Sequence, residues 1–105
     1  MNFMQGTLDV LILQALAAGP RHGYDVVAWI RQTTHGALRI EDGALYTALH
    51  RMERRGWLAP DWRTSPKGRR AKYYRLTSDG RAALRTGERR WARFAAAVGR
   101  VFAAR

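Results

Sequence analysis

The chain has 105 residues, is 47% hydrophobic, and carries 19 Lys and Arg against 8 Asp and Glu, for a net charge of +11. With four Trp, four Tyr and three Phe, this composition predicts one small folded domain rather than a disordered chain. The absence of cysteine excludes a disulfide-stapled secreted domain, a thiolate zinc finger, an iron–sulfur protein and a thiol enzyme.

The first predicted element is a helix over Thr7–Ala18, because its apolar residues recur with helical spacing and Gly19-Pro20 can end it. This is the most apolar stretch of the chain, yet it is shorter than the roughly 20 residues that a membrane span needs. The N-terminus also lacks the basic and apolar regions of a signal peptide. We therefore expect a cytoplasmic protein that makes no membrane contact.

Two further helices are predicted before residue 56. The second runs from Tyr24 to Thr33, and the third from Asp42 to Arg55, with Gly56 as its stop. Short helices joined by tight turns predict a helix-turn-helix core. The inward face of the third helix consists of Leu45, Ala48, Leu49 and Met52.

The pattern then changes to aromatic, partly alternating segments. Trp57–Arg63 and Ala71–Leu76 are predicted strands, and the turn-forming segment Thr64–Gly68 joins them into a hairpin. Three helices followed by a basic hairpin, the wing, are typical of a winged helix-turn-helix. The expected fold class is mainly α with a small β-hairpin (α+β), divided into a DNA-binding domain at 1–76 and a C-terminal dimerisation helix at 77–105.

The last helix begins at Thr77-Ser78-Asp79-Gly80, which supplies a capping hydroxyl and a first-turn acid. It would be roughly 40 Å long at about 1.5 Å per residue. Its apolar residues follow a seven-residue repeat. An exposed stripe of this kind favours a partner helix, most simply in a homodimer, although the helix could instead fold back on its own domain. The predicted dimer interface consists of Leu8, Leu84, Trp91, Phe94, Val98, Val101 and Phe102.

The positive charge lies in the second half of the chain. Residues 50–75 contain nine basic side chains against two acids, residues 76–105 contain seven against two, and residues 1–49 contain three against four. A localised basic patch on a folded domain is typical of a nucleic-acid-binding protein. The alternative is that the charge serves only solubility.

Several short motifs support a more specific interpretation. They are Gly6-Thr7-Leu8-Asp9, Pro20-Arg21-His22-Gly23-Tyr24, Leu45-Tyr46, and Gly68-Arg69-Arg70-Ala71-Lys72-Tyr73-Tyr74-Arg75-Leu76-Thr77. In combination they resemble the PadR family of bacterial transcriptional regulators, in its small subfamily with one C-terminal helix. The resemblance implies a dimeric repressor that binds an inverted-repeat operator in double-stranded DNA and is released by an effector. One departure is Glu41-Asp42-Gly43, which replaces the family's Ser-Pro-Gly and gives the third helix a weaker cap.

In this architecture the third helix enters the major groove. Arg51 and Arg54 are candidates to contact guanine, and Tyr46 either contacts the DNA backbone, as the resemblance implies, or only packs against a helix. The wing should contact phosphates or the minor groove, with one of its basic residues paired instead to Glu53. The predicted DNA-binding residues are Ala44, Tyr46, Thr47, His50, Arg51, Arg54, Lys67, Arg69, Arg70 and Lys72.

The resemblance to drug-responsive members also implies an effector site. There, a tryptophan of the last helix stacks flat aromatic ligands at the dimer interface, and Trp91 lies at the matching position. Asp9, Val10, Ala95 and Val98 fall beside it in the same alignment. Glu88 and Ala95 replace residues that are aromatic and acidic in those members, so the pocket would differ in shape and charge. Alternatively, Trp91 only anchors the dimer.

No catalytic or metal-binding pattern is present in the sequence. The three histidines are too scattered for a metal motif, and there is no cysteine nucleophile and no glycine-rich phosphate loop. We expect no enzymatic activity, no metal and no cofactor. Two other functions stay open: a winged-helix module that binds RNA or an acidic protein, and a drug-binding protein without a regulatory role.

Overall fold

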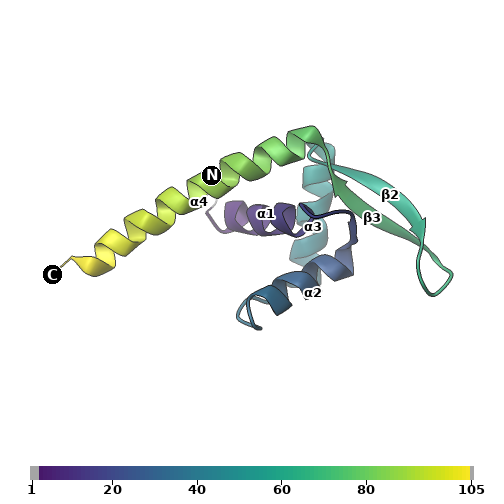
Figure 1. Ribbon diagram of the computed structural model, residues 1–105, viewed down its shortest axis with the longest axis horizontal. Helices are drawn as coiled ribbons and strands as arrows, with labels where there is room; N and C mark the ends of the chain where they lie inside the picture. Colours follow the sequence, from purple (N-terminus) through teal and green to yellow (C-terminus); the bar gives the residue numbers. More distant parts are fainter. Residues whose placement is uncertain (1–2, 105) are drawn as a thin grey trace.

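Four helices and a small sheet form the part of the chain that the computed structural model describes, which is residues 3–104 with side chains from residue 6 (Figure 1). The fold measures 59 × 29 × 23 Å. The hairpin projects at one end, and the C-terminal half of the last helix projects at the other. In chain order the elements are α1 (Phe3–Ala15), β1 (Arg21–His22), α2 (Gly23–Thr33), α3 (Asp42–Arg54), β2 (Leu58–Thr64), β3 (Arg70–Leu76) and α4 (Ser78–Ala103).

The predicted fold class is confirmed, and the differences lie at element boundaries. Helix α1 begins before Thr7, because Gly6 is tolerated inside the helix, and it ends earlier than Ala18. The backbone N–H of Ala17 bonds to the carbonyl of Gln14, and this tighter turn replaces the predicted last turn of helix. Gly56 adopts φ 79° directly after Arg55, the C-cap residue of α3, as expected of a helix stop.

Strand β1 was not predicted. Its two residues pair antiparallel with β3, so that Arg21 lies opposite Tyr74 and His22 opposite Tyr73, and the strand order is β1-β3-β2. The sheet therefore ties the turn between α1 and α2 to the base of the hairpin. The side chain of His22 also accepts a hydrogen bond from the N–H of Tyr24 and caps α2.

The core lies between the first three helices, the base of the hairpin and the first half of α4. Its largest fully buried side chains include Ile12, Leu16 and Ile30, and the predicted inward face of α3 is completely buried. The N-terminus of α3 has no side-chain cap from Glu41, in line with the weak cap expected from the sequence. Packing rather than capping therefore holds α3 in place.

The first half of α4 belongs to this core. A Cβ atom at Gly80 would lie 2.1 Å from the carbonyl oxygen of Trp57, and one at Gly87 would lie 2.4 Å from Cγ2 of Val10. Both glycines therefore allow close contact with neighbouring elements. Leu84 is buried in the same cluster. Its side chain thus packs within its own domain, which a heptad repeat alone does not distinguish from contact with a partner, and its place in the dimer interface stays a prediction.

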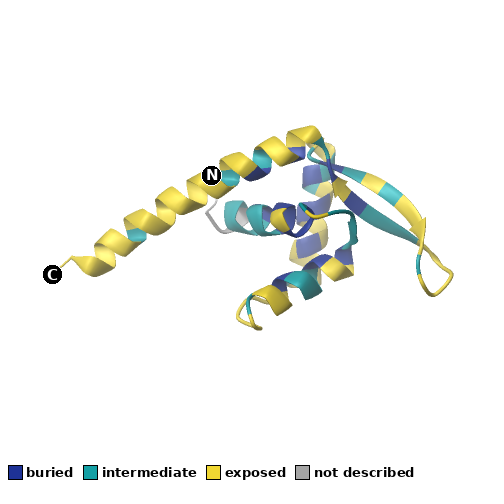
Figure 2. Cartoon of the chain, in the orientation of Figure 1, coloured by how far each residue is buried: buried dark blue, intermediate teal, exposed yellow. Residues whose placement is uncertain are grey.

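The second half of α4 projects away from the domain (Figure 2). From residue 91 to residue 104 every residue except Val98 is exposed, including Phe94, Val101 and Phe102. Phe102 is 83% exposed. Within residues 3–104, no helix is long and apolar enough to cross a membrane.

Candidate nucleic-acid interface and adjoining groove

The outer face of α3 presents half of the residues that were predicted to contact DNA. Its inner residues, Leu45, Ala48, Leu49 and Met52, hold the helix against the core. Because the helix has 3.6 residues per turn, the Cα–Cβ bonds of the intervening residues point away from the core. The exposed predicted residues are Ala44, Tyr46, Thr47, His50 and Arg54.

Tyr46 combines a packing role with an exposed edge. A Cβ atom at Gly23 would lie 3.1 Å from Cε1 and 3.3 Å from the hydroxyl of Tyr46, so the ring rests on the start of α2. The residue is nevertheless 39% exposed, and its ring centroid lies 6.5 Å from that of His50. The ring therefore fixes the spacing of α2 and α3 while one edge remains at the surface.

Arg51 does not face outward as predicted. Its guanidinium donates to the carboxylate of Asp9 on α1, its side chain is only 19% exposed, and its Nε is buried without a partner among the described groups. The helical spacing places its Cα beside the exposed residues, but its long side chain turns back to a carboxylate that needs a charged partner. In this conformation Arg51 is not available to contact guanine.

Burial and the ion pair with Arg51 have opposite effects on the pKa of Asp9. Burial raises the pKa of the Asp9 carboxyl above its ordinary value, and the charge and hydrogen bond of Arg51 oppose part of that rise. Asp9 is thus a buried carboxylate whose ion pair with Arg51 links α1 to α3.

The hairpin carries the second group of predicted residues. Lys72 Nζ lies 2.9 Å from Glu53 Oε1 on α3, which confirms the expectation that one basic residue of the wing pairs with Glu53. This hydrogen bond raises the pKa of Lys72. Lys67, Arg69 and Arg70 are exposed at or next to the tip. The wing thus has one cation fixed to α3 and others at the surface.

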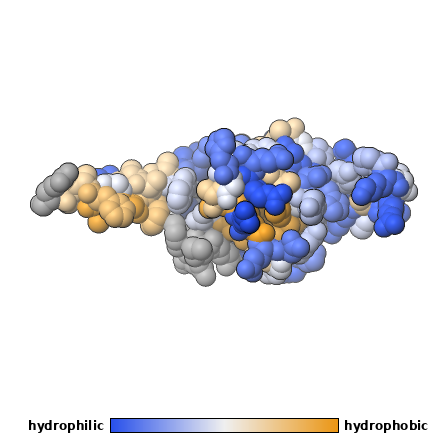
Figure 3. Space-filling view, turned by 90° about the horizontal axis from the view of Figure 1, so that it is seen from below, coloured by the Kyte–Doolittle hydropathy of each residue, from blue (hydrophilic) through white to orange (hydrophobic). Residues whose placement is uncertain are grey.

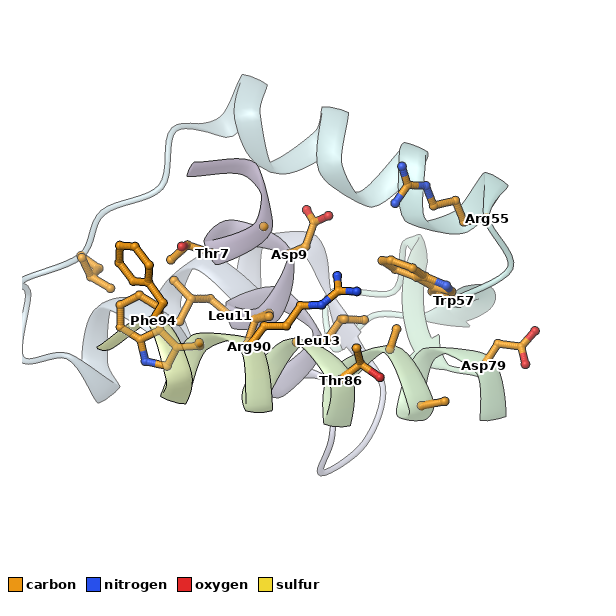
Figure 4. A pocket seen from close by; sticks show the side chains of 17 residues that line it. Thr7, Asp9, Leu11, Leu13, Arg55, Trp57, Asp79, Thr86, Arg90 and Phe94 are labelled. Carbon is orange, nitrogen blue, oxygen red and sulfur yellow. The ribbon is translucent and has the colours of Figure 1, made fainter. Parts of the chain in front are cut away.

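A groove of about 1320 Å³ lies between α1 and α4 (Figure 4). Of the predicted effector residues, Asp9, Val10 and Trp91 line it, whereas Ala95 and Val98 are not among its lining residues. The side chain of Arg90 extends from α4 into the groove, with Asp9 and Trp57 on the far side in Figure 4.

Sequence reasoning did not assign Arg55, Trp57 or Arg90 to this groove. Arg55 lies over the Trp57 ring, with its guanidinium carbon 5.2 Å from the ring centroid. Arg90 directly precedes the predicted Trp91 and could have been found as its neighbour on the helix. Trp57 and Arg55 follow α3, and only the tertiary structure brings them to α4.

The described residues contain no group of three His, Asp or Glu side chains that could hold a metal ion. The site consists instead of a basic surface on α3 and the hairpin, together with a mainly apolar groove behind it.

Comparison with known proteins adds the family. A family profile described as "Transcriptional regulator PadR-like family" matches residues 12–86. The chain belongs to the PadR-like family of transcriptional regulators. PadR regulators are DNA-binding proteins without enzymatic activity, which agrees with the absence of a catalytic pattern in the sequence.

Individual relatives agree with this assignment. The transcriptional regulator Rv3488 of Mycobacterium tuberculosis is 38% identical over 91 residues, which cover 85% of this chain and 78% of that protein. A solved PadR family regulator from Eggerthella lenta is 34% identical, with a TM-score of 0.79 over 95% of this chain and 85% of that chain. A transcriptional regulator from Clostridium thermocellum is 26% identical, with a TM-score of 0.84 over 95% of this chain and 97% of that chain.

Proposed function

We propose that this PadR-like regulator is a homodimeric repressor that binds an inverted-repeat operator through α3 and the wing and is released by a planar aromatic effector. Residues 1–76 would supply the DNA contacts, and residues 77–105 would form the dimer. The observation that carries the proposal is the separation of two surfaces, with hydrophilic residues at the hairpin end and apolar residues along the projecting part of α4 (Figure 3).

The charge and shape of α3 and the wing support DNA binding. Each phosphate that a basic side chain neutralises releases counterions, so an exposed basic surface favours binding to a polyanion. Arg54 remains at the surface of α3 as a candidate to contact guanine, and Thr47 as a candidate to contact a thymine methyl group. Lys67, Arg69 and Arg70 can contact phosphates without sequence preference.

The exposed apolar residues of α4 support the homodimer. Phe94, Val101 and Phe102 form an exposed apolar stripe that is unusual on a monomer surface. A second copy of α4 offers the same stripe, so symmetric pairing would cover both at once. Two recognition helices in a symmetric dimer match an operator built from two inverted half-sites.

The groove supports the effector. Trp57, Trp91 and Phe94 line it, and the Trp91 and Phe94 rings lie 6.0 Å apart between centroids. Because planar aromatic compounds stack on such rings, we expect them to quench tryptophan fluorescence. Quenching that is lost in Trp91→Phe would support the effector site, and no quenching by a broad panel would favour a purely structural Trp91.

The test of DNA binding is a footprint of the protein on the DNA upstream of its own gene, followed by titration of the protected duplex. At fixed salt, we expect the protected duplex to bind about 10³-fold or more tightly than random DNA. Equal affinity for random duplex or for RNA would contradict a repressor. Release of the operator by the compound that quenches fluorescence would connect the groove with regulation.

A further inference from the structure

We infer that Trp62 and Arg70 act as one unit that binds the sugar-phosphate backbone of duplex DNA, on the face of the hairpin turned toward α3. This inference rests on the proposed DNA binding and adds a binding residue, Trp62, that the motifs of the sequence did not indicate.

The pairing register places Trp62 and Arg70 on that face. Residues directly opposite each other in an antiparallel pair point to the same side, and alternate pairs share a side. Leu58 pairs with Leu76 and Pro60 pairs with Tyr74, and Leu58, Tyr74 and Leu76 are buried against the core. The next two pairs on this side are Trp62 with Lys72 and Thr64 with Arg70.

Lys72 confirms the direction of this face, because its ammonium group reaches Glu53 on α3. Beyond Lys72 the hairpin extends past the core, as Figure 1 shows, so Trp62 and Arg70 continue the same side into solvent. The outer part of the hairpin therefore presents an aromatic ring and a cation beside the exposed face of α3.

Trp62 is 53% exposed, and the guanidinium carbon of Arg70 lies 5.2 Å from the centroid of its ring. A cation over an aromatic face is held by the ring's quadrupole. This contact limits the rotamers of Arg70 before any ligand binds. Arg70 therefore loses less conformational entropy when it binds a ligand. The arrangement suits a ligand with a flat apolar face next to an anion, and a deoxyribose with its phosphate has both.

The space beside this unit also fits a phosphate backbone. A cleft of about 310 Å³ between α3 and the hairpin is lined by His50, Glu53, Arg54 and Lys72. Glu53 would repel a phosphate, but Lys72 pairs with it at 2.9 Å. Arg54 on α3 is then the remaining Lys or Arg that lines the cleft, and Arg70 lies on the same face of the hairpin, next beyond Lys72. When α3 enters the major groove, the strand that borders that groove would pass between them.

The opposite face of the hairpin provides a matched control. Arg63 is adjacent to Trp62 in sequence but points to the other side, where its NH2 group lies 2.9 Å from Asp61 Oδ2. Its guanidinium carbon also lies 5.4 Å from the centroid of the Tyr73 ring. Arg63 thus carries the same charge as Arg70 and lies one residue pair further from the turn, but an internal carboxylate already pairs with it.

The experiment titrates the full chain with its footprinted operator at several salt concentrations. For Trp62→Ala we expect about tenfold weaker binding with little change in the salt slope, because the lost contact is not ionic. For Trp62→Phe we expect most of the affinity to remain. For Arg70→Ala we expect a salt slope lower by about one. Since Trp62 orients Arg70, the double variant should lose less than the product of the two single losses.

Arg63→Ala should bind within about twofold of the wild type under the same conditions. The inference is overturned if Trp62→Ala binds like the wild type, or if Arg63→Ala loses as much affinity as Trp62→Ala. Wild-type protein that fails to protect any duplex would instead refute the proposed function itself.

A second measurement does not depend on comparing affinities. In the wild type, operator DNA should reduce the quenching of tryptophan fluorescence by acrylamide, because the DNA covers the exposed Trp62 ring. In Trp62→Phe this protection should be reduced. Equal protection in the two proteins would show that Trp62 stays exposed in the complex and would overturn the inference.

Discussion

Two regions of the molecule, residues 50–75 with the hairpin and residues 76–105 with α4, carry similar charge but present different surfaces. Residues 50–75, at the hairpin end, hold nine basic side chains against two acids, and residues 76–105 hold seven against two. At the hairpin end, basic groups lie over rings or pair with carboxylates, as Arg70 does with Trp62 and Lys72 with Glu53. At the other end, large apolar side chains such as Phe102 are exposed. The arrangement of the charge, rather than its amount, therefore distinguishes a surface for a polyanion from a surface for a second chain.

The largest expected effect is on dimer association through the exposed apolar residues of α4. In Phe102→Asp a symmetric dimer would lose two buried rings and would bury two charges instead. At roughly 1.5–3 kcal/mol for each ring, the dimer should dissociate at least 100-fold more readily. Sedimentation of the variant over a range of concentrations would measure this.

Ala96→Asp is the control, because Ala96 is exposed on the same helix but lies about 120° or more around its axis from Phe94, Val101 and Phe102. It adds the same charge and should leave association nearly unchanged. Dissociation by both variants to the same extent would mean that net charge, not the stripe, controls the dimer.

The next effect is on stability, at the contact between the start of α4 and the segment that leads into the hairpin. In Gly80→Ala the new Cβ would lie 2.1 Å from the backbone oxygen of Trp57, which cannot move without disturbing the start of the hairpin. We expect the free energy of unfolding to fall by about 3 kcal/mol, measured by urea denaturation. In Gly99→Ala the new Cβ would meet open space, so helix propensity should instead stabilise the protein by about 0.5–1 kcal/mol. Equal effects of the two variants would contradict the close approach at Gly80.

A smaller effect tests the basic end. Arg54→Ala should change base preference at one operator position, at a cost of about 1–3 kcal/mol in binding free energy, and should leave association through α4 intact.

Arg51→Ala should mainly lower the free energy of unfolding, because it leaves Asp9 buried without its partner. Binding to a set of operators with single base changes would separate the two variants. A change of base preference in Arg51→Ala without a loss of stability would mean that Arg51 leaves Asp9 when DNA binds.

The smallest expected effect is a pH dependence at Asp9. Burial raises the pKa of its carboxyl above the ordinary 3.8, so the folded chain holds this proton more tightly than the unfolded chain does. As pH rises from the ordinary value through the folded pKa, the unfolded state loses its proton first, and the contribution of Asp9 to the free energy of unfolding falls. Urea denaturation between about pH 4 and pH 7 should show this decline in the wild type relative to Asp9→Asn. Parallel pH profiles of the two proteins would contradict it.

The sequence predicted the elements whose patterns are local. The buried face of α3, the stop at Gly56 and a capping hydroxyl before α4 were all visible in the sequence, and the structure shows that the Thr77 hydroxyl accepts the hydrogen bond from Gly80 N–H. Strand β1 was missed because two residues have no periodicity, and only pairing with β3 makes them a strand.

The errors at the site have a different cause. The helical position of Arg51 was assigned correctly, but the direction of a long side chain depends on the carboxylates within its reach. Similarly, the phase of the repeat in α4 marks Leu84 and Phe102 as one stripe, although the domain covers the first and leaves the second exposed. Trp62 was not recognised because alternation in a strand does not identify which side faces α3.

The uncovered half of α4 has a thermodynamic consequence. In water, isolated helices of about 12–15 residues are marginally stable, and most helices in proteins are held by tertiary packing. Beyond Trp91 the domain offers almost no such packing. Helix formation there should therefore be coupled to association, so that dilution frays the C-terminal turns and concentration restores them. The circular dichroism signal per residue at 222 nm should then depend on protein concentration. In Phe102→Asp the signal should stay, at every concentration, at the value that the wild type shows when dilute.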